Sequence, residues 1–305
     1  GAGTVQLGSE VQFSIPQFGD FFHDMVLYVK LSAPTLPRVL GDTPDPTPID
    51  HTARWCDYPG ERLLQEVAFE VNGNPLDKYT ADSSVMRRNI RVQPNKETGY
   101  KRCVGQQIAR DAWFAPTPSD TDVTADVAQV HVTVTDGPQT PKTTLEGLSM
   151  LIPLSFWCND DPRLAVPSVA IPFGQRFIKM KLATAEQMVG DLNTRGSADT
   201  STLSTPTIET MALSINNIFV NPEIHKIFIQ RIGFTLIRVH REQKITVTSA
   251  EDEILLQNLK WPIETMFVGI RPTSQKASMA HWHKFTSVSD ESLEVPQLLS
   301  SAGTF

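Results

Sequence analysis

Apolar and polar residues alternate with a period of two in many short segments of the chain, which is typical of β-strands with one buried face. The clearest case is residues 177–182, where isoleucine, methionine and leucine alternate with phenylalanine and lysine. A short apolar run at 166–171 precedes this segment, and a glycine–glutamine break separates the two. We therefore predict two strands joined by a turn across residues 164–182. Further strands are predicted at 11–15, 25–31, 67–71, 130–134, 149–157 and 211–220.

The segments between the predicted strands hold turn and loop signals. Asn72 and Gly73 follow one strand directly, and Asn-Gly favours a tight hairpin because both residues accept a positive φ. Three polar stretches rich in proline, serine, threonine or aspartate are predicted as long loops exposed to proteolysis. They are residues 32–55, 115–128 and 184–206. Short strands with long loops between them favour an all-β sandwich or jelly roll.

One helix is predicted, and it is short. Asn221 can cap it, Pro222 fits the first helical position, and Glu223 favours the positive end of the helix dipole. The apolar residues of one helix face are Ile224, Ile227 and Phe228. Because two turns are not stable alone, we expect this face to be buried. Two more strands are predicted after the helix, at 234–239 and 263–270.

Composition excludes several classes of function. The 305 residues include 27 lysines and arginines against 34 acidic residues, so the net charge is −7, and there is no basic block. This argues against direct nucleic-acid binding, which depends on cationic contacts to phosphates. No apolar run approaches the roughly 20 residues of a membrane helix, so we expect no membrane insertion.

The cysteine content favours a reducing compartment. Cys56, Cys103 and Cys158 are an odd number, and none lies in a CxxC pair. We expect three free thiols rather than a disulfide scaffold or a zinc site. The chain also has no Asn-x-Ser/Thr sequon, which agrees with assembly away from the secretory pathway.

His281 and His283 form an HxH motif, the spacing of cupin-type metal sites. Such sites also have a glycine six residues before the first histidine and a glutamate shortly after the second. Here the first position is Gln275, and the next glutamate is the distant Glu291. The motif is therefore interpreted as two ordinary surface or interface histidines.

Other polar clusters also have structural interpretations. Aspartates and a histidine lie among phenylalanines near residue 20, an acidic turn follows residue 158, and three arginines lie near residue 90. The residues concerned are Asp20, His23 and Asp24; Asn159, Asp160 and Asp161; and Arg87, Arg88 and Arg91. There is no GxSxG, P-loop or GxGxxG motif. We predict no enzyme activity, no catalytic, cofactor-binding or metal-ligating residue, and no cofactor.

Seven sequence blocks are distributed along the chain from Ser14 to Phe285. They are SIPQFGDFFHDM (14–25), CDYPGERLLQEVAFEVNGNPLDKY (56–79), GPQTPK (137–142), LAVPSVAIPFGQRFIKMKL (164–182), INNIFVNPEIHKIFIQRIGFTLIRVH (215–240), LKWPIETMFVGIRPT (259–273) and WHKF (282–285). In this order the blocks resemble the major capsid proteins of the African swine fever virus and faustovirus group. The stretch between Gln107 and Val130 looks much shorter than in the swine-fever protein.

The resemblance implies a double jelly-roll subunit. Residues 1–220 would form the first jelly roll with long surface loops, 221–231 a linker helix, and 232–305 the start of an incomplete second jelly roll. Three subunits would form a pseudo-hexagonal capsomer, and capsomers would tile the icosahedral shell of a large double-stranded DNA virus. The implied partners are two further copies, neighbouring capsomers and minor capsid proteins, with an inner membrane beneath the shell. The implied location is the virion capsid, assembled in the host-cell cytoplasm.

Two other functions stay open from the residues alone. One is a carbohydrate-binding β-sandwich of a surface or spike protein, which would need an exposed aromatic platform. Trp55 and Trp113 are the candidates for that platform. The other is a cupin-type enzyme, although the HxH motif lacks its neighbouring residues.

Overall fold

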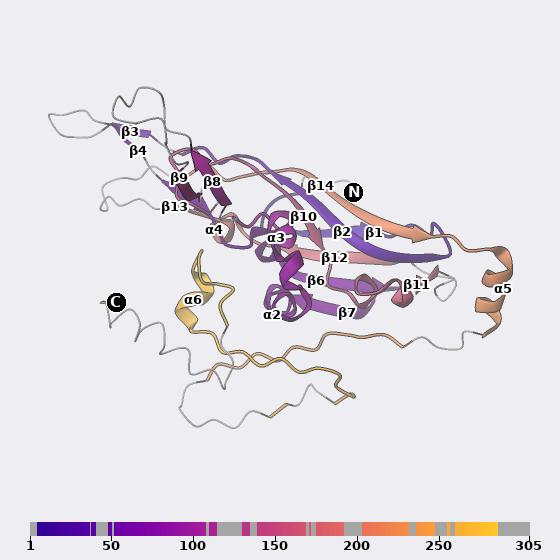
Figure 1. Cartoon of the computed structure of the whole chain (residues 1–305). Helices are drawn as coiled ribbons and strands as arrows, with labels where there is room; N and C mark the ends of the chain where they lie inside the picture. The colour runs from indigo at the N-terminus through magenta and orange to yellow at the C-terminus, as the bar shows by residue number, and fades with distance from the viewer. Residues whose placement is uncertain are drawn as a thin grey trace.

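The fold is built from two antiparallel β-sheets that face each other (Figure 1). One sheet has the order β1 (Glu10–Ser14), β12 (Arg176–Leu182), β6 (Leu64–Val71) and β7 (Asn74–Thr80). In the other sheet, β2 (Phe21–Leu31) pairs with β14 (Ile208–Ile218) on one side, and with β10 (Leu148–Pro153) and β11 (Val166–Pro167) on the other. The computed structural model describes residues 5–36, 38–40, 48–50, 52–107, 110–114, 130–134, 139–168, 171, 175–191, 203–231, 236–247, 255–256 and 260–285.

Strand β2 is the centre of its sheet. Met25, Leu27, Val29 and Leu31 point inward and are completely buried. The residues between them are half-buried or exposed, so β2 has one core face. A full ladder connects β2 to β14 from Leu31 to Phe21, interrupted by two register shifts.

The alternation at 177–182 is confirmed in β12. Ile178, Met180 and Leu182 are buried, while the lysines between them are exposed. Of the strand predicted at 166–171, Val166–Pro167 pairs with β2 and Ser168 is no longer in a strand, while residues 169 and 170 lie outside the described residues. One residue beyond Pro167, the Ser168 N–H donates to the Asp20 carbonyl at 2.8 Å, just before β2 begins.

The predicted hairpin is also confirmed. Strands β6 and β7 pair directly around Asn72 and Gly73, whose φ angles are 52° and 78°. Both values lie in the left-handed region, where asparagine and glycine are the least strained residues. The Asn-Gly dipeptide therefore sets the register of two of the four strands in this sheet.

Aromatic rings fill the space between the sheets at one end. The ring centroids of Phe22 and Phe69 lie 6.1 Å apart in an edge-on arrangement, and they connect the two sheets. Phe69 also contacts Phe156 and Trp157, at centroid distances of 5.9 and 5.8 Å. Such rings contribute both buried area and specific geometry to the core.

Some predicted loops contain short elements. The stretch 32–55 includes strands, and the stretch 184–206 begins with a helical turn and a strand, so both are less irregular than predicted; residues 115–128 lie outside the described residues. The additional strand pairs are β3–β4, β8–β9 and β5–β13. Their bounds are β3 (Arg38–Leu40), β4 (Pro48–Asp50), β5 (Ala53–Trp55), β8 (Arg110–Phe114), β9 (Val130–Val134) and β13 (Val189–Asp191).

Helices α2 (Ala81–Arg91) and α3 (Pro94–Cys103) were not predicted. The inward residues of α2 are Ala81, Val85 and Arg88, a helical spacing that packs this helix on the sandwich. The short helical elements are α1 (Pro59–Leu63), η1 (Trp157–Asn159), η2 (Pro162–Leu164), α4 (Ala185–Met188) and α6 (Thr273–Ala277). Within the described part of the chain, no helix is long and apolar enough to cross a membrane.

Helix α5 (Pro222–Arg231) begins where predicted, and Glu223 N–H donates to the Asn221 side chain at 3.1 Å. Its predicted burial is wrong for two residues, since Ile224 and Ile227 are 45% and 48% exposed. The side chain of Phe228 lies outside the described residues. Figure 1 shows α5 at one end of the sandwich, beyond the sheets. The predicted burial required a second domain on the other side of the helix.

The strands predicted at 234–239 and 263–270 are wrong for the residues that the structure describes. Residues 236–239 and 263–269 are in no strand, and Ile270 is a single bridge residue. Their sequences suit strands, but a strand exists only when neighbouring backbone groups satisfy its hydrogen bonds. Among the described residues after α5, no ladder provides such neighbours.

Replacing Phe69 with alanine tests the two-sheet core. The ring is completely buried between the sheets, so Phe69→Ala should lower the free energy of unfolding by about 3–5 kcal/mol. Phe18 is 62% exposed, so Phe18→Ala should change it by less than about 0.5 kcal/mol. Urea denaturation followed by circular dichroism measures both. Equal effects of the two substitutions would contradict this core.

Candidate functional site

The aspartates and histidine near residue 20 are used in local structure. The Asp20 carboxylate accepts the Val220 N–H at 2.8 Å, which connects the start of β2 to the end of β14. His23 is buried, and its Nδ1 lies 3.0 Å from the Asp24 carboxylate. The structure therefore brings His23 and Asp24 together. The partner of Asp20 is instead the backbone N–H of Val220, just after the end of β14.

The three side chains of the acidic turn at 159–161 do not bind a common partner. The Asn159 side chain binds both the N–H and the carbonyl of Met25, at 3.2 and 2.9 Å. Asp160 pairs with Arg87, and Asp161 pairs with the arginine two residues along the chain. Each of the three side chains thus has a separate structural partner.

The arginine cluster divides between the interior and the surface. Arg88 is buried and pairs with Glu61 at 2.9 Å, and Tyr100 donates to the same carboxylate at 2.6 Å. Burial raises the pKa of Glu61 despite these partners. This network joins α1, α2 and α3, whereas Arg91 on α2 is exposed to solvent.

The two histidines of the HxH motif lie in different environments. His281 is exposed, while the His283 ring packs 4.9 Å from the Tyr58 ring. Burial and nearby cations lower the pKa of His283 to about 3, so its ring is neutral at pH 7. Among the described residues, no group of three or more histidine, cysteine or acidic side chains could hold a metal ion.

The aromatic platform of the carbohydrate-binding alternative is not present at Trp55. This side chain is completely buried, and its indole N–H donates to the Glu146 carbonyl at 2.9 Å. The side chain of Trp113 lies outside the described residues. All three cysteines are free thiols, as predicted: Cys56, Cys103 and Cys158.

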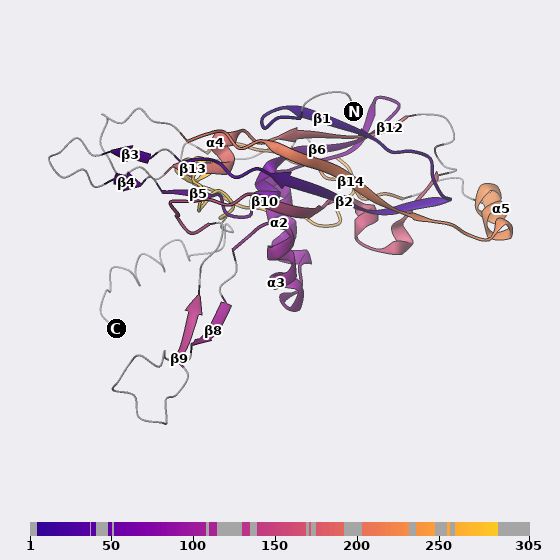
Figure 2. The ribbon, with the colours of Figure 1, turned by 90° about the horizontal axis from the view of Figure 1, so that it is seen from above.

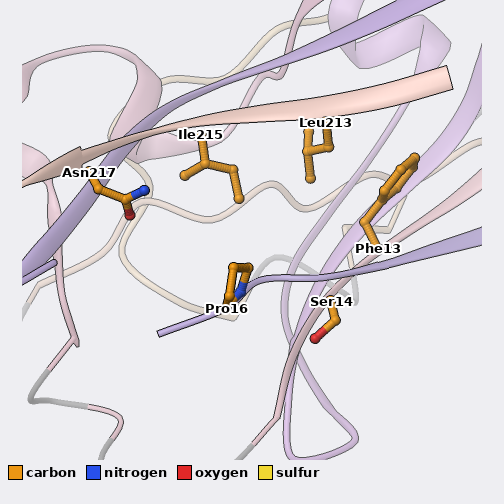
Figure 3. Close-up of a pocket in the computed structure, with 6 residues that line it drawn as sticks. All are labelled: Phe13, Ser14, Pro16, Leu213, Ile215 and Asn217. Atoms are coloured by element: carbon orange, nitrogen blue, oxygen red, sulfur yellow. The ribbon is translucent and has the colours of Figure 1, made fainter. Parts of the chain in front are cut away.

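A hollow of about 200 Å³ opens between the edge strands of the two sheets. Phe13 and Pro16 line it from the side of β1, and Leu213 and Ile215 from β14 (Figure 3). Its two polar lining residues carry a hydroxyl and an amide, and it contains no acid–base group. The hollow is thus a mainly apolar groove between β1 and β14, the edge strands of the two sheets. We call it the apolar seam, and its lining suits contact with another apolar surface.

A group of charged contacts lies on the opposite side of the sandwich, where described residues between 240 and 285 approach β7 and α2 (Figure 1). We call the contacts between these residues and the sandwich the clasp. At its centre, Asp82 on α2 pairs with Arg271 at 2.8 Å and with Lys244 at 2.6 Å. Arg271 also donates to the Trp282 carbonyl at 2.6 Å, and its guanidinium lies over the Phe285 ring.

Electrostatics favours the charged form of Asp82. Burial alone would raise the pKa of this carboxyl, but the hydrogen bond and charge of Lys244, together with Arg271, hold it below its usual value. A lowered pKa in the folded state means that the carboxylate stabilises the fold above about pH 3.9, the unfolded value. This contribution is lost only as the pH falls through the lower folded pKa.

A second carboxylate of the clasp is almost completely buried. Asp77 on β7 accepts the His240 N–H at 2.7 Å, and its other oxygen lies 3.0 Å from Nδ1 of the same residue. The His240 ring stacks 5.5 Å from the Tyr79 ring. Next to it, the Thr80 hydroxyl donates to Glu242 at 2.7 Å.

Trp282 provides the apolar part of the clasp. Its ring is buried against Ala81 and Val85 of α2, and its indole N–H donates to the Asp57 carbonyl at 2.6 Å. The Arg62 guanidinium lies 5.5 Å from the Trp282 ring and donates to two carbonyls at the end of α6. Sequence reasoning missed this site because the partners on its two sides lie far apart in the sequence, by 162 residues in the Thr80–Glu242 contact and by 189 in the Asp82–Arg271 contact.

Comparison with known proteins gives consistent matches. The family model described as "Major capsid protein N-terminus" matches residues 1–221. The major capsid protein of African swine fever virus (isolate Pig/Kenya/KEN-50/1950) is 31% identical over 94% of this chain and 64% of the relative. The alignment covers 412 residues, so the relative has insertions compared with this chain. The major capsid protein of Phaeocystis pouchetii virus is 25% identical over 61% of the chain.

A solved structure agrees with the sequence matches. The faustovirus major capsid protein aligns with 94% of this chain at a TM-score of 0.77 and 33% identity, covering 64% of its own length. This match confirms the predicted all-β, double jelly-roll class. The chain spans 64% of the length of the swine-fever relatives. By its sequence profile and its fold, the chain belongs to the major capsid protein family.

Proposed function

We propose that this protein is a structural subunit of a virus shell, in which three copies form a pseudo-hexagonal capsomer. The observation that carries the proposal is the alignment of 94% of the chain with the faustovirus major capsid protein at a TM-score of 0.77. The name "Hexon protein p72" of a swine-fever relative supports a capsomer role. Capsomers of this kind would tile an icosahedral shell around a large double-stranded DNA genome.

The proposed division of the chain follows the same comparison. Residues 1–220 form the first jelly-roll domain, 221–231 the linker helix, and 232–305 the start of the second domain. The match of the family model to residues 1–221 supports the first boundary. The position of α5 at the end of the sandwich supports its role as a linker.

In this proposal the clasp fixes the start of the second domain on the first. Two carboxylates of the first domain, Asp77 and Asp82, bind three cationic or imidazole groups of the later segment. Trp282 adds a buried apolar contact. Since the linker is short, these contacts would hold the two domains in one relative position before copies assemble.

The described residues after α5 also have large apolar side chains exposed to solvent. Those with such a side chain are Leu236, Val239, Ile245, Val247, Leu255, Leu256, Trp261, Ile263, Met266, Phe267, Val268 and Ile270. Large exposed apolar surfaces mark interaction sites or faces covered by another domain. We propose that they are covered in the assembled capsomer by other copies of this protein.

The remaining parts of the proposal concern partners and location. Neighbouring capsomers and minor capsid proteins are the further partners, in a virion capsid assembled in the host-cell cytoplasm with an inner membrane beneath it. The role is structural rather than enzymatic. Supporting this, most titratable side chains of the clusters singled out from the sequence pair with one another or with the backbone. The carbohydrate-binding alternative has lost one of its two candidate tryptophans, because Trp55 is buried.

Electron microscopy of the purified protein tests the proposed function. We expect particles with three-fold symmetry and a pseudo-hexagonal outline, together with a mass by light scattering near three times the 33.9 kDa of the chain. The reason is that the apolar seam and the exposed apolar residues need burial by other copies. A stable monomer at all concentrations would contradict the proposal.

Substituting Asp82 tests the clasp. Asp82→Asn removes the partner of Arg271 and Lys244, so the free energy of unfolding should fall by about 1–3 kcal/mol, the range for hydrogen bonds to charged groups. Residues 271–285 should then become sensitive to protease. Glu264→Gln is the matched control, because its pair with Arg238 is exposed and should contribute less than about 1 kcal/mol. If both variants behave like the unmodified protein, the clasp does not stabilise the fold.

A further inference from the structure

Positive charge is concentrated in one segment of this acidic protein. Residues 87–103, which we call the basic hairpin, contain six lysines and arginines and one glutamate. The whole chain has a net charge of −7, so the remaining residues together carry −12. The basic hairpin covers the second half of α2 and all of α3.

Half of these cations are paired within the molecule. Arg87 and Arg88 bind acidic residues of the sandwich, and Lys101 pairs with the glutamate on α3. Arg91, Lys96 and Arg102 are exposed and form no ion pair with any residue that the structure describes. Three cations are therefore presented to solvent in one short region.

Helix α3 also lacks the burial that normally stabilises a helix of its length. None of its ten residues is buried, whereas helices this short usually depend on tertiary packing. Figure 2 shows α3 projecting from the side of the sandwich, away from the sheets. Ile90 on α2 is 58% exposed next to Arg91. A projecting basic surface with an exposed apolar residue has the composition of a protein contact.

We propose that the basic hairpin docks on an acidic face of a second copy of this protein. This inference deepens the proposed shell function and rests on it. Charge complementarity supports a second copy, because the rest of each molecule carries −12 and is present at the same concentration. Nucleic acid fits less well, since three free cations are fewer than the roughly 6–10 phosphate contacts of typical binding.

The protein carries a natural attachment point for testing this contact. Cys103 is the exposed last residue of α3, while Cys56 and Cys158 are buried. Burial raises the pKa of each buried thiol to about 12, so neither forms a reactive thiolate near pH 7. A maleimide photo-crosslinker should therefore attach to the basic hairpin alone.

The experiment mixes crosslinker-labelled protein with an equal amount of ¹⁵N-labelled protein under assembly conditions. We expect light-dependent crosslinks between the two isotopic forms, on peptides rich in aspartate or glutamate. The triple variant R91E/K96E/R102E should weaken self-association roughly tenfold or more, because it places like charges opposite each other. The control K226E/K260E/K276E makes the same change of net charge at exposed lysines elsewhere and should have a smaller effect.

Four outcomes would overturn the inference. The protein could assemble without crosslinks between copies, or the two triple variants could weaken assembly equally. Either result would contradict a docking role of the basic hairpin but not the proposed shell function. Binding of the labelled hairpin to phosphatidylserine vesicles, with no contact between copies, would assign it to a lipid surface instead. A protein that stays monomeric throughout would overturn both this inference and the proposed function.

Discussion

Strand β2 is the constraint on which the rest of the structure depends. Its inward residues from Met25 to Leu31 are completely buried, and three other strands pair with its two edges. Phe22 on the same strand reaches across to Phe69 and so connects the two sheets. The Asn159 side chain binds both backbone groups of Met25. Displacing β2 would therefore disturb one entire sheet and the aromatic end of the core.

Sequence alone predicts those elements whose signals are local. The alternation in β12 and the Asn72-Gly73 turn each depend on neighbouring residues, and both are confirmed. Helix α2 was missed although Ala81, Val85 and Arg88 have helical spacing, because its polar residues outweigh this short apolar face. Burial of Ile224 was wrong, since exposure depends on which domain lies beside the helix.

The clasp could not be predicted from the sequence. Asp82 and Arg271 form an ordinary acid–base pair only after β7, α2 and the later segment have been brought together by folding. The block WHKF, which contains Trp282, was used for the family resemblance. No residue near Trp282 in the sequence indicates that its ring packs against Val85. The structural roles of the polar clusters near residues 20, 88 and 160 could be predicted, because acidic and basic side chains commonly form ion pairs or bind the backbone. Contacts between segments far apart in the sequence, such as those of the clasp, are thus the part of this fold that local signals do not predict.

We propose that the clasp holds the start of a second domain on the first, and hydrogen exchange of the intact protein tests this most directly. Amides of β2 and β6 should exchange slowest, because both strands lie inside their sheets. Residues 271–285 should show clear protection as well, since Arg271 and Trp282 bind α2 and the segment before α1. Exchange of residues 271–285 at the rate of an unfolded chain, with β2 still protected, would contradict a second domain fixed by the clasp.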